Sequence, residues 1–184
     1  RFAEIFANLE RAPDAVAQDL AKIPGVSAVQ TSIALSARLD LPNVPEPATG
    51  LFLSLPETGD PVLNRLFLRK GRMLHERAGH GQVLVGEAFA DAHGLKPGDE
   101  IAAVLYGRRQ TLRIAGIVLS PEYIFEAPPG SALPDNRSYG VFWMPYKELA
   151  NAANMEGAFN QVAFTLAPFA RSSAVVAEID RQLK

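Results

Sequence analysis

The chain has 184 residues, a mass of 19.9 kDa, and 18 basic against 20 acidic side chains, for a net charge of −2. Its 48% hydrophobic and 21% charged content is typical of a globular protein and excludes a disordered chain, and its length fits one domain or two small lobes. The balanced charge argues against nucleic-acid binding. The absence of cysteine excludes disulfides, thiolate metal sites and cysteine nucleophiles.

The first residues carry apolar side chains at the i, i+3, i+4, i+7 spacing of an amphipathic helix. These positions are Phe2, Ile5, Phe6 and Leu9. Pro13-Asp14 restarts the helical pattern, and Pro24-Gly25 ends it. We therefore predict helical structure over residues 1–23.

The last residues also predict a helix, over residues 171–184, with Ser172 and Ser173 as capping residues. Neither terminal helix has both a start and a stop signal. We therefore expect an excised segment whose two end helices continue beyond it, with Arg1 and Lys184 close together on one edge. The alternative is a complete domain with frayed ends.

Between these helices, strands and short helices alternate without a regular βαβ period, which predicts the α+β class. The predicted strands cover residues 26–41, 51–55, 82–85, 100–106, 109–119, 139–144 and 161–166. Gly94 should end a helix over Glu87–His93, and Pro145 should begin one that runs to about Asn154. The strands on either side of Gly107-Arg108 should form a hairpin.

The sequence offers no recognisable catalytic, cofactor or metal site. It lacks the G-x-S-x-G elbow, the phosphate-binding loop G-x-x-x-x-G-K-[ST] and the dinucleotide fingerprint G-x-G-x-x-G. His75, His80 and His93 lie in a solvated loop or at a helix end, where we expect structural or solvated roles. We therefore expect no catalytic residues, no cofactor and no metal.

One loop has an unusual composition. Tyr123, Ile124 and Phe125 lie together in the proline-bounded segment PEYIFEAPPG. An aromatic tip on a rigid loop could contact a partner or an apolar substrate. The same residues could instead fold back as a lid over the core.

From residue 83 the chain resembles a known family. The segment VLVGEAFADAHGLKPGDEI, followed by a hairpin and IAGIVLSPEY, is similar to the extracytoplasmic core domain of MacB-like and FtsX-like ABC transporter permeases. The matching features are Glu87, Gly94-Leu95 and Gly98-Asp99 with the basic hairpin that follows. Gly71-Arg72 and the upstream IPGVSAV fit the same pattern, so the resemblance covers nearly the whole chain.

The resemblance implies a two-lobed domain between the first and second transmembrane helices of a permease. A membrane-proximal α/β lobe would contain residues 1–67 and 158–184, and an inserted, mainly β lobe would contain residues 68–157. The domain would be periplasmic and non-catalytic, and helices 1–23 and 171–184 would be its paired stalks. Its partners would be a cytoplasmic ATPase and a second permease subunit, with a periplasmic adaptor protein as a further candidate.

On this reading, ATP-driven motion of the membrane helices moves the lobes, which export or extract a lipid, a lipoprotein or another amphiphile. We expect the isolated segment to be monomeric or weakly associated. Two alternatives stay open. A ligand-sensing receptor domain would need a deep polar pocket in one lobe, and a secreted enzyme would need titratable side chains that converge in a cleft.

Overall fold

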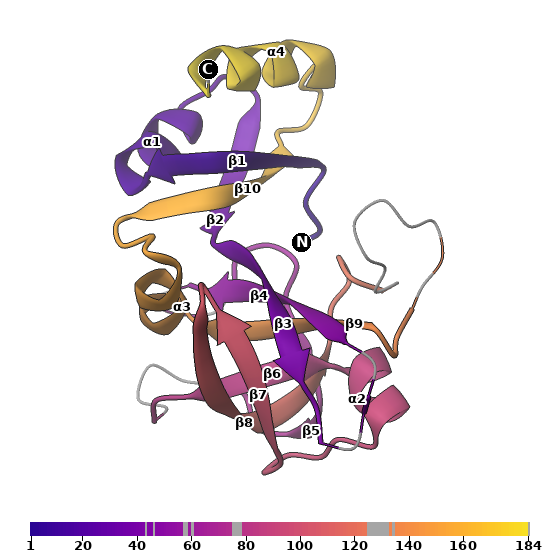
Figure 1. Ribbon diagram of the computed structural model, residues 1–184. Helices are drawn as coiled ribbons and strands as arrows, with labels where there is room; N and C mark the ends of the chain where they lie inside the picture. The colour runs from indigo at the N-terminus through magenta and orange to yellow at the C-terminus, as the bar shows by residue number, and fades with distance from the viewer. Residues whose placement is uncertain are drawn as a thin grey trace.

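The computed structural model describes residues 1–42, 44–45, 47–56, 59, 61–74, 79–124, 133 and 135–183. Two β-sheets and short helices make up this part of the chain, which confirms the predicted α+β class. In Figure 1 a small three-stranded sheet, with helices on its outer side, lies above a larger barrel-like sheet.

The small sheet has the strand order β1-β10-β2, and both neighbouring pairs are antiparallel. Its strands are β1 (Ile5–Pro13), β2 (Val26–Ser32) and β10 (Ala158–Leu166). Helices α1 (Asp14–Leu20) and α4 (Ser172–Gln182) cover one face and bury a compact apolar cluster there, which includes Leu20, Phe164 and Ile179.

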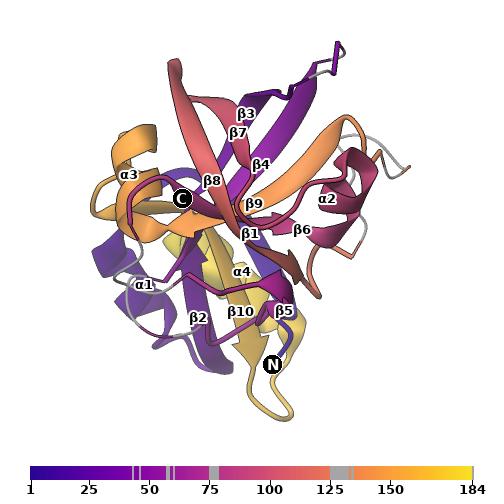
Figure 2. The same cartoon turned by 90° about the horizontal axis from the view of Figure 1, so that it is seen from below.

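The larger sheet has the order β5-β8-β6-β9-β4-β3-β7, and the additional pairing of β7 with β8 closes six strands into a barrel. Its strands are β3 (Ala34–Asp40), β4 (Ala48–Leu55), β5 (Phe67–Gly71), β6 (Gln82–Gly86), β7 (Glu100–Leu105), β8 (Arg108–Leu119) and β9 (Tyr139–Pro145). Strand β5 flanks the end of β8. Helices α2 (Glu87–His93) and α3 (Tyr146–Ala153) lie at opposite sides of the barrel (Figures 1 and 2).

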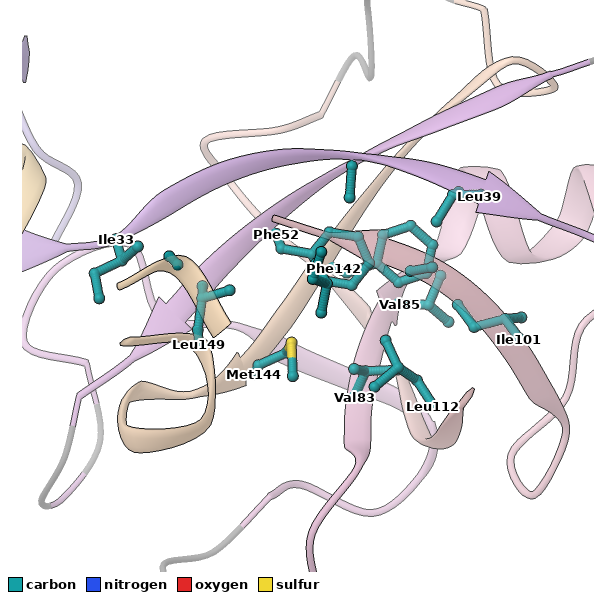
Figure 3. Close-up of a cluster of buried hydrophobic side chains, with 14 of the residues drawn as sticks. Ile33, Leu39, Phe52, Val83, Val85, Ile101, Leu112, Phe142, Met144 and Leu149 are labelled. Carbon is teal, nitrogen blue, oxygen red and sulfur yellow. The ribbon is translucent and has the colours of Figure 1, made fainter. Parts of the chain in front are cut away.

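Large apolar side chains fill the barrel. Phe52 of β4 stacks on Phe142 of β9 with ring centroids 4.8 Å apart, and Phe89 of α2 meets Phe142 edge-on at 5.5 Å. Figure 3 shows Phe52 and Phe142 at the centre, with Val83, Val85 and Met144 around them. The three rings are completely buried, so the barrel has a closely packed apolar core.

The predicted helix over residues 1–23 is wrong in its first half, because Ile5–Pro13 forms strand β1. The alternation of a strand explains the same apolar residues. Ile5 and Leu9 pack with the helices, whereas Phe6 points to the opposite face of the sheet. The ring centroids of Phe6 and Phe2 lie 6.1 Å apart. Backbone pairing with β10 decides between the two periods, and only α1 remains helical.

The expected lobe boundary at residue 67 does not separate the two sheets. Strands β3 and β4, over residues 34–55, belong to the larger sheet, although the expectation put them in the lobe formed by the chain ends. The chain leaves the small sheet after β2 and returns to it through β10. The described residues of the small sheet and its helices are therefore 1–32 and 158–183, and the division into two lobes stays a prediction.

The remaining predicted elements are confirmed, with shifts of a few residues at their ends. The extended segment 26–41 forms β2 and β3, and Gly94 ends α2 with φ of 64°. The β7–β8 hairpin turns through Tyr106 and Gly107, at φ of 47° and 77°. The predicted serine cap of α4 is wrong, because Arg171 occupies the N-cap position and no side chain bonds there.

The predicted stalk helix over residues 1–23 is not formed in its first half, and of the described helices only α1 and α4 share a face of the small sheet. The N-terminal segment packs through Ala3 against Leu63 and Ala163, whereas α4 packs on the other face of the small sheet. Lys184 lies outside the described residues, so its expected proximity to Arg1 stays a prediction. Across the described ranges, we find no helix with the length and apolar character that crossing a membrane requires.

Candidate functional site at the junction of the two sheets

The passage from β2 into β3 is held by side chains from both sheets. At Ile33, which is completely buried, the backbone N–H donates to Ser54 Oγ at 2.8 Å and the carbonyl accepts from Ser54 N–H at 2.9 Å. The next residue, Ala34, donates to Asn160 Oδ1 at 2.7 Å and accepts from Asn160 Nδ2 at 2.9 Å. Ser54 belongs to the barrel and Asn160 to the small sheet, so the crossing strand is fixed to both.

A second connection centres on Asn64, which is 6% exposed and has φ of 51°. Asparagine tolerates this left-handed conformation better than most residues. Its backbone N–H donates to the Arg1 carbonyl at 2.9 Å, and its Oδ1 accepts from Ala3 N–H at 2.9 Å. Its Nδ2 donates to Glu122 Oε2 at 2.7 Å, which ties the first residues of the chain to the segment after β8.

Glu122 and Tyr123 carry this network on to the small sheet. Burial raises the pKa of the Glu122 carboxyl above its ordinary value, although hydrogen bonds from Asn64 and Tyr123 oppose the shift. Burial and the nearby Glu122 charge also raise the pKa of Tyr123, whose hydroxyl hydrogen-bonds with both Glu122 and Gln161. The Gln161 side chain accepts from Ser32 Oγ at 2.9 Å and donates to Asn8 Oδ1 at 3.3 Å. The network therefore reaches all three strands of the small sheet.

A cavity of about 40 Å³ lies between these groups. Its lining includes Ser32 and Gln161 from the small sheet and Ser54, Glu122 and Trp143 from the barrel side. A space of this size holds only a few water molecules. The junction therefore suits mechanical connection better than the binding of an organic ligand.

The structure gives different positions to the sequence-predicted contact residues. Tyr123 is half-buried and meets the ring of Trp143 edge-on, with centroids 6.2 Å apart. The neighbouring Ile124 is 60% exposed. Phe125 lies outside the described residues. Tyr123 thus packs inward on the barrel, as a lid would. The contact of Tyr123, Ile124 and Phe125 with a partner or substrate stays a prediction.

Two of the three histidines have partners that do not belong to the junction network. His80 Nδ1 is 3.7 Å from Glu148 Oε1, and His93 Nε2 is 2.8 Å from the Arg137 carbonyl oxygen. His75 lies outside the described residues. Within the described part of the chain, no group of three or more histidine or acidic side chains is arranged to hold a metal ion.

Sequence reasoning did not identify the junction residues Asn64, Glu122, Asn160 and Gln161. A signal for two of them was present. Strand β10 reads AFNQVAF, and an adjacent Asn-Gln pair inside an otherwise buried strand requires hydrogen-bond partners. No comparable signal marks Asn64, because its partners lie about sixty residues away in both directions.

This architecture also occurs in known proteins. A family model described as the MacB-like periplasmic core domain matches residues 4–182. No match was found among curated proteins.

Three solved structures share the fold. The extracellular domain of the ABC-type transporter YknZ from Gram-positive bacteria has a TM-score of 0.57 at 12% identity, over 94% of this chain and 86% of that one. The periplasmic region of MacB from Actinobacillus actinomycetemcomitans has a TM-score of 0.51 at 18% identity, over 95% and 71%. A domain of a putative permease from Porphyromonas gingivalis has a TM-score of 0.51 at 14% identity, over 96% and 79%.

Proposed function

The chain belongs to the family of MacB-like periplasmic core domains, and from that premise we propose that it acts as the non-catalytic, force-transmitting head of an ABC transporter permease. The match over residues 4–182 is the observation that carries this proposal. The same match favours a transporter over a receptor sensor domain. ATP hydrolysis then belongs to a separate cytoplasmic subunit.

The junction of the two sheets supports a mechanical role. A head that transmits displacement must keep its parts in register while its base moves. The bonds of Asn64 to Arg1 and Ala3 connect the first residues of the chain to Glu122, and the bonds of Gln161 extend this connection across the small sheet. A displacement of the N-terminal segment would therefore reach both sheets.

Under this proposal the head works with a cytoplasmic ATPase and with a second permease subunit, whose own head faces it. A periplasmic adaptor protein is a further proposed partner. The cargo class that we propose is a lipid, a lipoprotein or another amphiphile. The exposed Ile124, beside Tyr123, is the proposed contact point for cargo or adaptor, together with Phe125.

The test uses the full-length permease with its ATPase in proteoliposomes. Because this segment contains no cysteine, Tyr106→Cys on the barrel hairpin and Val176→Cys on α4 provide one reporter site in each sheet region; their exposed fractions are 65% and 39%. Each spin label is paired with a label in the second permease subunit. We expect the distances from both sites to change together between the ATP-free and vanadate-trapped states.

An ATPase variant that cannot hydrolyse ATP is the control, and it should abolish turnover-dependent changes. Transport of a fluorescent phospholipid, a lipoprotein and an amphiphilic drug, measured in parallel, identifies the cargo class. Distances that stay the same in every nucleotide state would contradict the proposal. So would undiminished transport after deletion of residues 4–182.

A further inference from the structure

A groove of about 340 Å³ lies on the barrel, and its described lining residues differ from those of the junction cavity. It forms where β5 ends against β8, next to the tight turn at residues 96–99. Its lining residues are Gly71, Arg72, Gln82, Pro97, Gly98, Arg113, Ile114 and Ala115. This volume is at the lower end of the range typical of small-ligand sites.

The backbone fixes the walls of the groove. Gly71 has φ of 78°, and a Cβ there would lie 2.4 Å from the Ala115 carbonyl oxygen and 2.8 Å from Pro97 Cγ. Only glycine therefore allows this close approach of β5 to β8. Arg72 N–H donates to the Ala115 carbonyl at 3.0 Å, and Gly98 N–H donates to the Ile114 carbonyl at 2.7 Å.

Three of the lining residues, Arg72, Gln82 and Arg113, have side chains that can donate hydrogen bonds. Gln82 of β6 lies opposite Arg113 of β8 in the sheet register, and the Arg72 guanidinium donates to Gln82 Oε1. Arg113 Nη2 lies 3.0 Å from Glu100 Oε1, with both side chains more than half exposed. Exposed pairs of this kind contribute little to stability, so Arg113 can exchange this partner for a ligand.

We propose that this groove binds a phosphate group. Among the described residues that line it there are two arginines and no carboxylate, although the whole chain has a net charge of −2. Paired guanidinium groups match the oxygen atoms of a phosphate, and the apolar floor of Pro97, Ile114 and Ala115 suits the organic part of a phosphate ester. The inference does not depend on the transport proposal, so either one can fail alone.

The phosphate could come from a lipid headgroup or from a free phosphate, and titrations of this 184-residue chain distinguish the two. The probes are inorganic phosphate, glycerol 3-phosphate and monomeric dihexanoyl phosphatidic acid, with dihexanoylglycerol as the uncharged control. We follow the backbone amide NMR signals of Gly71, Gly98 and Ala115. The expected result is a saturable shift of these signals with at least one phosphate-bearing probe and none with dihexanoylglycerol. Saturation by phosphatidic acid alone indicates a lipid headgroup. Saturation by inorganic phosphate or glycerol 3-phosphate as well indicates a free phosphate.

The double variant Arg72→Gln/Arg113→Gln should weaken binding about tenfold or more, because it removes two charge-assisted contacts. Arg108→Gln, at the hairpin turn outside the groove, removes a positive charge elsewhere and should leave binding unchanged. Thermal melting of each variant checks that its fold is intact. The absence of a saturable shift with every phosphate probe would overturn the site, and so would equal weakening of binding by Arg108→Gln. Binding of dihexanoylglycerol as tight as that of phosphatidic acid also overturns it.

Discussion

The barrel interior and the junction between the sheets differ in the groups that hold them together. Inside the barrel, the completely buried rings of Phe52, Phe89 and Phe142 pack against one another. At the junction, Asn64, Glu122 and their neighbours connect by hydrogen bonds around a small cavity. A packed apolar core is costly to deform, whereas each hydrogen bond contributes only about 0.5–1.5 kcal/mol net. Loss of a barrel side chain should therefore cost more stability than loss of any one hydrogen bond at the junction.

The largest expected effect is in the barrel. Phe142→Ala should lower the free energy of unfolding by about 3–5 kcal/mol, because it removes a completely buried ring that contacts two others. Denaturant unfolding followed by tryptophan fluorescence measures the change. Phe142→Leu is the control and should cost less. A loss below about 1 kcal/mol for the alanine variant would mean that the barrel core is not the rigid part of the molecule.

At the junction, Asn64→Ala should cost about 1–3 kcal/mol, because it leaves the Ala3 N–H and the Glu122 carboxylate without their partner. Alanine at position 64 also strains the backbone, whose φ is 51°, whereas glycine adopts this angle freely. Asn64→Gly removes the same side chain without the strain, so the difference in stability between the two variants measures the backbone contribution. Hydrogen exchange of the Ala3 amide should speed up in both variants. Unchanged exchange would show that Asn64 does not hold the N-terminal segment.

A buried hydroxyl on the small sheet should give a smaller effect of opposite sign. Thr165 is 4% exposed, and its Oγ1 has no hydrogen-bond partner among the described residues. Thr165→Val keeps the shape and removes the polar group, so it should be neutral or stabilising by up to about 1 kcal/mol. Thr165→Ser keeps the hydroxyl and loses the methyl group, and it should destabilise. Thermal unfolding of the three proteins tests this order, and a clear loss of stability in the valine variant would reveal a partner for the hydroxyl.

The smallest expected effect is the pH dependence that Glu122 adds. The pKa of Glu122 in the folded protein is raised above its ordinary value of 4.5. As the pH rises, the unfolded chain therefore loses the Glu122 proton at a lower pH than the folded protein does. This contribution to stability is therefore complete below pH 4.5 and declines as the pH rises through the folded pKa. Glu122→Gln should remove that decline, whereas Glu156→Gln, at an exposed position, should retain it. Unfolding curves from pH 4 to 8 measure the difference, and parallel pH profiles for the wild type and Glu122→Gln would contradict the assignment.

Local signals in the sequence predicted much of the barrel. The glycine that ends α2, the hairpin turn at Gly107 and the apolar strands 82–85 and 139–144 each depend on residues close in the chain. The junction could not be predicted in this way, because Asn64, Glu122 and Gln161 come from three separate segments. The helix predicted over residues 1–23 is wrong in its first half, because Ile5–Pro13 is a strand. The ordered set of turn motifs, in contrast, identified the family.

By itself, the sequence determined the α+β class and the family, because turn residues and short apolar runs act through neighbours in the chain. Tertiary structure decided which sheet residues 34–55 join and whether Ile5–Pro13 is a helix or a strand. The apolar residues at 5 and 9 suit either a helical or a strand period. Hydrogen bonds to β10, more than 140 residues away, select the strand.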